Sequence, residues 1–175
     1  MNIFLTFLSI WLMTITSVYD FQKGKSTNNW RIVDDGVMGG LSKGKLTLDD
    51  EGHGVFSGIV SLENNGGFSS LRYRFNDISV ENANKVVLQV KGDGKNFQFR
   101  VKDKINQYHS YIYEFETSGK WQTIEIPFKN MYPSFRGRKL SIPNFNHSQI
   151  EEIAFLIGNK KAESFELKID KIYIK

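Results

Sequence analysis

The residue types that most often carry catalysis or bind metals are few and widely separated in this chain. The three histidines, His53, His109 and His147, stand in no spacing that metal ligands adopt. The chain has no cysteine, which excludes a disulfide framework, a thiolate metal site and a cysteine nucleophile. From these residues we expect no metal site and no cofactor.

The acidic residues that could act as general acids or bases occur as adjacent pairs, at residues 34–35, 49–50 and 151–152. Neighbouring residues of a β-strand point to opposite faces, so no such pair places two carboxylates around one substrate. Carboxylates from separate strands could still meet in space. Because the sequence offers no constellation typical of catalysis, we expect a protein that is not an enzyme.

Two glycine-rich segments carry the most information. They are residues 30–42, WRIVDDGVMGGLS, and residues 56–72, FSGIVSLENNGGFSSLR. Glycine pairs allow close backbone approach, and Asp or Asn side chains fix such loops by accepting hydrogen bonds from nearby N–H groups. The Asn65-Gly66 pair is also a favoured hairpin turn. Met38 and the valine before it are apolar, so they must pack beneath the loop or contact a partner.

At these residues the chain resembles the complex I intermediate-associated protein 30 family, whose pattern is W-x-I/V-V-x-D-x-V-M-G-G-x-S followed by F-x-G-x-I/V-S-L-E-N-N-G-G-F-x-S. Residues 121–128 (WQTIEIPF), residues 132–137 (YPSFRG) and the ending FLIGNKKAESFELKIDKI are similar to that family too. The resemblance implies a galactose-binding-like jelly roll. It also implies a role in assembling respiratory complex I in mitochondria, although this chain does not begin with an Arg-rich transit peptide.

The leading hypothesis for function is a non-catalytic binding or assembly-factor domain, chaperone-like in that it holds a client protein. Its candidate binding residues come from the two glycine-rich segments: Trp30, Asp35, Met38, Gly39, Gly40, Asn65, Gly66, Gly67 and Arg72. We expect the Asp35 carboxylate to accept hydrogen bonds from the N–H groups of residues 36–38. The same carboxylate could pair with Arg72, which would lock the two segments together.

The alternative hypothesis is an exported carbohydrate-binding module on the same fold. Sugar sites combine aromatic side chains with polar hydrogen-bonding groups. Tyr111 and Tyr113 share one strand face and could supply the aromatic groups. However, Ile112 on the other face indicates a central strand, on which both sides can be core. The expected partner is therefore a protein client or, in the alternative, a carbohydrate.

The elements that position these residues are short β-strands, because apolar and polar residues alternate along most of the chain. The predicted strands are residues 30–33, 45–48, 54–62, 68–75, 86–91, 97–102, 111–115, 121–127, 150–157 and 165–174. About ten short strands separated by turn signals favour an all-β fold, an antiparallel β-sandwich or jelly roll. Residues 129–148 are expected to form one irregular loop.

The last predicted strand contains an irregularity. Phe165, Leu167 and Ile169 alternate with polar residues, but Ile172 and Ile174 fall on the opposite parity. A shift of one residue inside a strand is typical of a β-bulge.

Length and charge indicate one domain that does not bind nucleic acid. The chain has 175 residues, and its 23 Lys and Arg exceed its 19 Asp and Glu only slightly. The basic residues are also interleaved with acids, so they form no basic stripe. Residues 1–17 are uncharged and shorter than a bilayer-spanning helix of roughly 20 residues, which favours a signal peptide.

The expected domain organisation is thus a signal peptide over residues 1–17 and one β-sandwich domain over residues 18–175. The protein is expected to be exported, periplasmic or secreted, with no stable transmembrane span after signal removal. The alternative is a protein anchored in the membrane through an uncleaved N-terminal segment.

Overall fold

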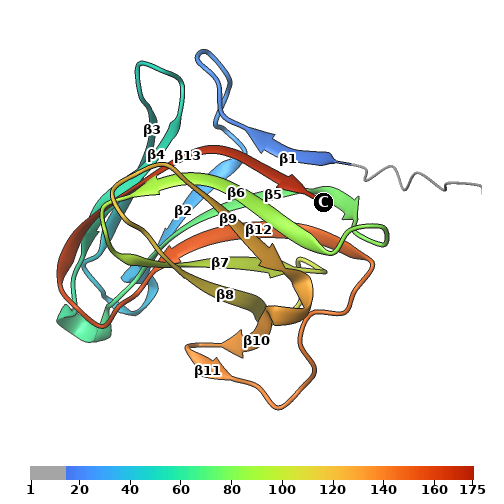
Figure 1. Ribbon diagram of the computed structural model, residues 1–175. Coiled ribbons are helices and arrows are strands. Elements are labelled where there is room, and N and C mark those ends of the chain that lie inside the picture. The colour runs from blue at the N-terminus through green and yellow to red at the C-terminus, as the bar shows by residue number, and fades with distance from the viewer. Residues whose placement is uncertain (1–14) are drawn as a thin grey trace, which may run out of the picture.

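A computed structural model describes residues 15–175, apart from the side chains of Val37 and Met38, and shows two antiparallel β-sheets packed face to face (Figure 1). Sheet A contains β1 (Thr16–Asp20), β3 (Lys43–Leu48), β4 (Gly54–Val60), β6 (Lys85–Gly92), β9 (Gln122–Pro127) and β13 (Glu163–Ile174). Its strand order is β3-β4-β13-β6-β9, with β1 paired to the end of β13.

Sheet B contains the remaining strands of the described chain, in the order β11-β10-β8-β7-β12-β5-β2. They are β2 (Trp30–Asp34), β5 (Ser69–Ser79), β7 (Asn96–Lys102), β8 (Ser110–Glu116), β10 (Tyr132–Phe135), β11 (Arg138–Lys139) and β12 (Gln149–Ile157). The predicted antiparallel β-sandwich is confirmed, and each of the predicted strands has its counterpart here.

The helices of the described residues are three single turns of 3₁₀ helix. They are η1 (Asp35–Met38), η2 (Glu63–Asn65) and η3 (Phe128–Asn130). Within residues 15–175, no helix is long and apolar enough to cross a membrane.

The hydrophobic core lies between the two sheets, because each strand directs alternate apolar side chains inward. In sheet B, Phe99 of β7 lies opposite Phe155 of β12, which lies opposite Leu71 of β5, and all three are fully buried. Fully burying one such side chain stabilises the fold by about 1.5–3 kcal/mol. This packing therefore fixes which face of each strand points outward.

The irregularity predicted in the last strand is confirmed. The pairing of β13 with β6 shifts register between Ile169 and Lys171, so one extra residue is accommodated there. As a result Ile169, Ile172 and Ile174 all point into the core despite their mismatched parity.

The prediction of one irregular loop over residues 129–148 is wrong in part. Residues Tyr132–Ser134 pair with β8, and a two-residue turn at Arg136-Gly137 joins β10 to β11. Both turn residues have positive φ angles, 48° and 74°, as a type I′ hairpin turn requires. Strands this short leave little periodicity in the sequence, and their formation depends on the edge that β8 offers.

The start of the chain also contains a strand that the sequence did not reveal. Strand β1 begins at Thr16 and pairs with the end of β13, so the two lie side by side in Figure 1. The predicted signal boundary after Ser17 falls inside β1, and residues 1–14 of that predicted segment lie outside the described residues.

Candidate functional site

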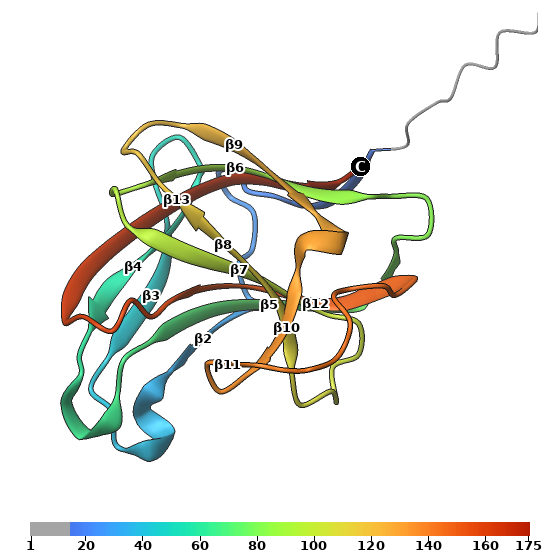
Figure 2. The same cartoon turned by 60° about the horizontal axis from the view of Figure 1, so that its bottom comes forward.

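The two glycine-rich segments meet at one end of the sandwich, where η1 and η2 lie next to each other (Figure 2). The carboxylate of Asp35 joins them. It accepts hydrogen bonds from the backbone N–H of Gly67 at 2.6 Å and of Phe68 at 3.2 Å. It also accepts the Ser42 hydroxyl at 2.5 Å and the Ser42 backbone N–H at 3.1 Å. We call this arrangement of Asp35, Ser42, Gly67 and Phe68 the Asp35 clasp.

Glycines make the close packing of the Asp35 clasp possible. A Cβ atom on Gly40 would lie 2.2 Å from Asp35 Oδ1, and one on Gly66 would lie 2.7 Å from Asp35 Oδ2. The Asn64 side chain adds a hydrogen bond from Nδ2 to the Gly39 carbonyl oxygen at 3.1 Å. The glycine pairs therefore let two loops approach a buried carboxylate.

The electrostatics of the clasp favour a charged aspartate. Burial acts to raise the pKa of Asp35, but the hydrogen bonds from the Ser42 hydroxyl and from three backbone N–H groups outweigh it and hold the pKa below its ordinary value. The neighbouring Asp34 is used in a similar way, because its carboxylate accepts hydrogen bonds from Ser69 Oγ at 2.5 Å and from Gly44 N at 2.9 Å. Both acids thus tie strands and loops together.

The expected partners of Asp35 differ from those in the structure. The N–H groups that it accepts belong to Ser42, Gly67 and Phe68 rather than to residues 36–38. Within the described residues, Asp35 and Arg72 form neither a hydrogen bond nor an ion pair. Asp35 is positioned by η1 at the end of sheet B, whereas Arg72 lies in the middle of β5 with its side chain on the outer face.

The predicted binding residues are mostly brought together, but few present a side chain to solvent. Trp30 is packed in the core, where its ring stacks on Tyr73 with centroids 4.8 Å apart, and Asp35 is only 6% exposed. Gly39 and Asn65 are exposed at the clasp. Met38 belongs to η1, but its side chain lies outside the described residues.

The aromatic residues of the sugar hypothesis face the core. Tyr111 is 4% exposed and its hydroxyl lies 2.7 Å from His147 Nε2, while Tyr113 is half-buried against the core. The two tyrosines therefore form no exposed platform, since their strand directs this face toward sheet A.

A different surface, absent from the sequence prediction, crosses the outer face of sheet B. Residues directly opposite one another in antiparallel strands share a face. The strand registers place one residue from each of six neighbouring strands in a single row, in the order Arg31, Arg72, Ala154, Arg100, Ile112 and Tyr132. The next row contains Arg74, Glu152 and Lys102. We call Arg31, Arg72, Arg74, Arg100 and Lys102 the arginine face.

Most of the charge on the arginine face is not neutralised. Arg74 Nε donates a 2.7 Å hydrogen bond to Glu152, which is buried beside it. Within the described residues, Arg31, Arg72 and Arg100 form no ion pair with any carboxylate. Arg31 and Arg72 also lie directly opposite each other, an arrangement that is destabilising for like charges. The face therefore carries positive charge that folding alone does not require.

Arg100 is the most constrained of these side chains. It is half-buried and donates hydrogen bonds from Nε at 3.0 Å and from Nη2 at 2.5 Å to Gln98 Oε1. Gln98 in turn donates to Glu114, which also accepts the Tyr132 hydroxyl at 3.1 Å. Burial, together with the nearby charge of Arg72, lowers the pKa of Arg100 to about 10. Tyr132 and the carboxylate of Glu114 act in the opposite direction and raise this pKa, so the guanidinium is charged at neutral pH and is held in place by Gln98.

The floor between the arginines is apolar. Ala154, Ile112 and Leu156 point to this outer face, yet they are 4%, 1% and 6% exposed because longer side chains cover them. Charged groups above a partly dehydrated surface interact more strongly with a ligand than charges in bulk water do.

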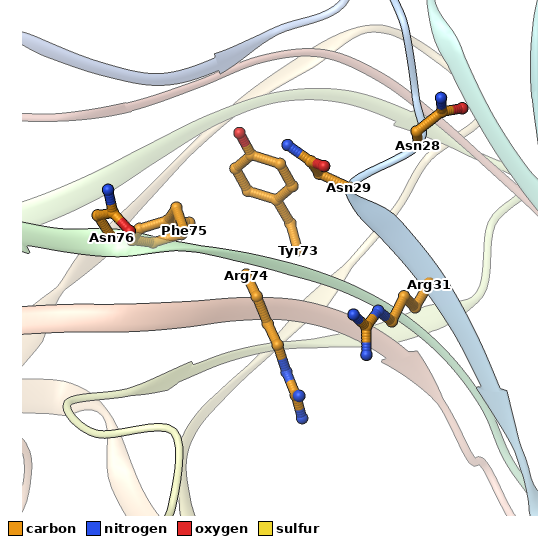
Figure 3. Close-up of a pocket in the computed structure, with 7 residues that line it drawn as sticks. All are labelled: Asn28, Asn29, Arg31, Tyr73, Arg74, Phe75 and Asn76. Atoms are coloured by element: carbon orange, nitrogen blue, oxygen red, sulfur yellow. The ribbon is translucent and has the colours of Figure 1, made fainter.

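A pocket of about 460 Å³ adjoins the arginine face at the start of β2. Figure 3 shows Arg31 and Arg74 on one side of β5, with Tyr73 and Asn29 on the other. Strand β5 continues beyond the last residue that pairs with β2, so the pocket forms where the edge of β5 is left open.

A larger hollow of about 780 Å³ lies between β6 and the loop before β12, where Lys85 and Glu125 form a 2.6 Å ion pair.

Sequence reasoning missed the arginine face although part of its signal is local. Arg72 and Arg74, and Gln98, Arg100 and Lys102, occupy alternate positions of their strands and hence one face of each strand. What the sequence could not show is that β5, β12 and β7 are neighbours.

In the part of the chain that the structure describes, no three His, Asp or Glu residues are grouped so that they could hold a metal ion.

Comparison with known proteins assigns both a family and a fold. The family model for complex I intermediate-associated protein 30 matches residues 19–169. The Drosophila melanogaster protein "Complex I intermediate-associated protein 30, mitochondrial" is 24% identical over 183 residues, with 89% of this chain and 61% of that protein covered. An uncharacterised protein of Schizosaccharomyces pombe is 27% identical over 167 residues, covering 82% of this chain and 76% of that protein.

Among solved structures, the chain shares its fold with carbohydrate-binding modules. A family 11 module from Clostridium thermocellum, solved in complex with a beta-1,3-1,4-mixed-linked tetrasaccharide, has a TM-score of 0.69 at 20% identity, with 91% of this chain and 94% of that chain covered. An agarase has a TM-score of 0.60 at 12% identity, with 92% of this chain but only 24% of the agarase covered.

Proposed function

The chain belongs to the complex I intermediate-associated protein 30 family, and from that premise we propose that it is a non-catalytic binding domain that holds a protein partner on its arginine face. The mitochondrial relative spans more than this chain, which corresponds to 61% of its length. The proposal therefore concerns binding by this β-sandwich, and not the complete activity of that relative.

The observation that carries this proposal is the row formed by Arg31, Arg72 and Arg100. Three arginines on neighbouring or next-neighbouring strands have no carboxylate partner among the described residues, and two of them stand directly opposite each other. Arginine is enriched at protein interfaces, where its flat fork of donors pairs with partner groups. An outer sheet face with an apolar floor and unpaired arginines has the composition of a binding surface.

The uncharged, apolar start of the chain supports export, so we propose that the partner is another exported or envelope protein. In this respect the domain differs from its mitochondrial relative, whose name places it in another compartment. The proposed role is to hold a client protein in the compartment to which this chain is exported.

The test compares proteins that the domain retains from the envelope fraction of its source cells. The domain is used as wild type, as Arg72→Glu and as Lys45→Glu, a matched control on exposed strand β3 of the other sheet. We expect quantitative mass spectrometry to find partners that wild type and Lys45→Glu retain equally and that Arg72→Glu loses. Equal retention by all three proteins, with unchanged melting temperatures, would contradict the proposal.

A carbohydrate ligand is the second candidate, and the pocket in Figure 3 favours it. Its lining combines the amides of Asn28, Asn29 and Asn76 with the ring of Tyr73, the two kinds of group that sugar sites use. The fold shared with carbohydrate-binding modules supports this reading. Isothermal titration with a mixed-linked glucan tetrasaccharide tests it, with Asn29→Ala expected to abolish any heat of binding. Absence of binding by the wild type would remove a neutral glucan from consideration.

A further inference from the structure

We propose that the arginine face binds the carboxylates of an acidic, extended segment of the partner protein, with Arg72 and Arg100 as its two anchors. This inference rests on the proposed function, because it specifies the chemistry of the partner that the same face holds.

The two anchors are arranged to grip one carboxylate from both sides. Arg72 and Arg100 are both paired with Ala154, one strand to each side of it. Strands lie about 4.8 Å apart, so the two backbones are separated by roughly 10 Å with a methyl group between them. Both arginine side chains therefore extend over the same small residue, and a guanidinium can donate two parallel hydrogen bonds to a carboxylate.

Gln98 fixes one anchor for this task. Its Oε1 atom accepts hydrogen bonds from Nε and Nη2 of Arg100, which leaves Nη1 for a ligand. Its amide is oriented in turn by the hydrogen bond to Glu114. Gln98 is therefore a positioning residue, because it touches Arg100 rather than the ligand.

The length and mixed chemistry of the row select an extended peptide over a small anion. Six strands at a spacing of about 4.8 Å give a row roughly 24 Å long. Positive charge lies at Arg31, Arg72 and Arg100, and the end of the row carries the half-buried Tyr132 ring. A peptide with acidic side chains and an apolar side chain at one end matches both parts.

Carboxylates on the same face argue against a polyphosphate backbone. Glu152 already pairs with Arg74, and Glu114 lies beside Tyr132. A nucleic acid would place phosphates along the whole row, beside the negative charges of the two rows that flank it. A peptide can instead offer backbone N–H groups to Glu114, since carboxylates accept such donors.

The probe for this inference is a fluorescently labelled twelve-residue peptide of Asp, Glu and Leu, and its control is the same peptide with Asn and Gln in place of the acids. Fluorescence anisotropy of the full chain measures binding at low and at physiological salt. We expect only the acidic peptide to bind, with an affinity that falls as salt rises. Arg72→Gln should weaken it about ten-fold, while Lys45→Gln should leave it unchanged.

Gln98→Leu provides a test of positioning that charge removal does not. It keeps both arginines and the net charge but releases Arg100, so we expect weaker binding of the acidic peptide with a similar salt dependence. If Arg100→Gln fails to fold, Arg31→Gln and Arg72→Gln together test the same row.

Three results would overturn the inference. Equal binding of the neutral peptide would show that charge is not recognised, and acidic-peptide binding unaffected by Arg72→Gln would place the site elsewhere. Tighter binding of an oligouronate than of the peptide would make an acidic carbohydrate the occupant. If Arg72→Glu loses its captured proteins while no acidic peptide binds, the proposed function stands and only the acidic class of partner is wrong.

Discussion

At the scale of single residues, the two glycine-rich segments serve mainly to hold loops of this chain together. Asp35 gathers four hydrogen-bond donors from two loops, and Gly40 and Gly66 give it the space to do so. A run of Asp, Asn and Gly that resembles a binding loop in the sequence is therefore a clasp in the fold. Arginines that have no carboxylate partner among the described residues lie instead on the arginine face, at outward-pointing positions of their strands.

Replacing Asp35 tests the clasp directly. Asp35→Ala leaves three backbone N–H groups without their acceptor, while the Ser42 hydroxyl keeps its longer contact to the Ser61 carbonyl oxygen, so we expect a loss of roughly 1–3 kcal/mol in the free energy of unfolding. Asp35→Asn keeps one acceptor oxygen and should cost less. Chemical denaturation measures both, with Asp50→Asn, an exposed acid on the turn between β3 and β4, as the control. Unchanged stability in both Asp35 variants would make Asp35 a contact residue instead.

The glycine beside the carboxylate offers a second, sharper comparison. Gly40→Ala would place a methyl group 2.2 Å from Asp35 Oδ1, whereas a Cβ on Gly36 meets no atom within 4 Å. We expect Gly40→Ala to lower the free energy of unfolding by roughly 1–3 kcal/mol and Gly36→Ala to leave it nearly unchanged. Equal effects of the two substitutions in thermal melts would show that the close approach does not matter.

His109 predicts a loss of stability in mild acid. The side chain is 5% exposed, and within the described residues neither ring nitrogen has a hydrogen-bond partner. Burial lowers its pKa, against the charge of Asp103, which raises it, while His147 and Lys102 lower it further. The neutral form is thus favoured in the folded state.

The direction of the pH effect on stability follows from the difference between the pKa of His109 in the unfolded and in the folded chain. The unfolded chain takes up the proton near pH 6.5, so the contribution of His109 is complete above that pH and is lost as the pH falls toward its lower folded pKa. We expect the free energy of unfolding to decline from pH 7.5 to 5.5, by at most about 1.4 kcal/mol per pH unit from this group. In His109→Phe, which keeps a ring between Tyr108 and Tyr111, the decline should be shallower; an identical pH profile would contradict the prediction.

At the scale of elements, two features decide what the strands can do. The bulge in β13 keeps its apolar side chains in the core on both sides of residue 170, and the bare edge of β5 beyond β2 creates the pocket in Figure 3. The bulge was readable in the sequence because it shifts the parity of isoleucines. The bare edge was not, because it results from the unequal lengths of paired strands.

Deleting Asp170 tests the bulge as an element. The deletion would restore continuous pairing, and Ile172 and Ile174 would stay buried, because removing one residue restores the regular alternation of the strand. The cost should therefore be small, about 1 kcal/mol, from the hydrogen bond that the Phe21 N–H donates to the Asp170 carbonyl oxygen. Deleting Lys168 instead removes a residue from the regular part of β13 and turns the apolar side chains on one side of it outward, so it should cost roughly 3–6 kcal/mol. Circular dichroism and urea denaturation measure both deletions. A deletion of Asp170 that is as damaging as that of Lys168 would contradict this account of the register.

At the scale of the whole molecule, the Asp35 clasp and the arginine face lie on different surfaces of the sandwich. The Asp35 clasp lies at one end, and the outer face of sheet B carries the arginine face on β2, β5 and β7. The same fold serves carbohydrate-binding modules, so the fold alone does not select a ligand. The chemistry of the exposed face must do so.

Export is a property of the whole chain, and it remains a prediction. We expect the exported protein to begin near Val18, because the first 17 residues are apolar and uncharged and Ser17 is a small residue at the boundary. Strand β1 would then keep Val18 and Tyr19, its two buried residues. Intact mass of the protein in the culture medium or periplasm measures the start site. A protein that retains Met1 to Ser17 would support the anchored alternative.

The sequence by itself determined the all-β class, most strand positions, the bulge near Ile169 and the family. These follow from side-chain periodicity and from a long motif, and both are local properties of the chain. It also directed attention to Asp35, whose partners, however, come from 7 to 33 residues away.

Only the tertiary structure decided which candidate residues are available to a ligand. Tyr111 and Arg100 belong to adjoining strands of similar pattern, yet one faces sheet A and the other faces outward. The row from Arg31 to Tyr132 exists because β2, β5, β12, β7, β8 and β10 are neighbours, an order that the chain does not follow. Strand order arises from long-range pairing and core packing, so no local pattern could have placed those arginines together.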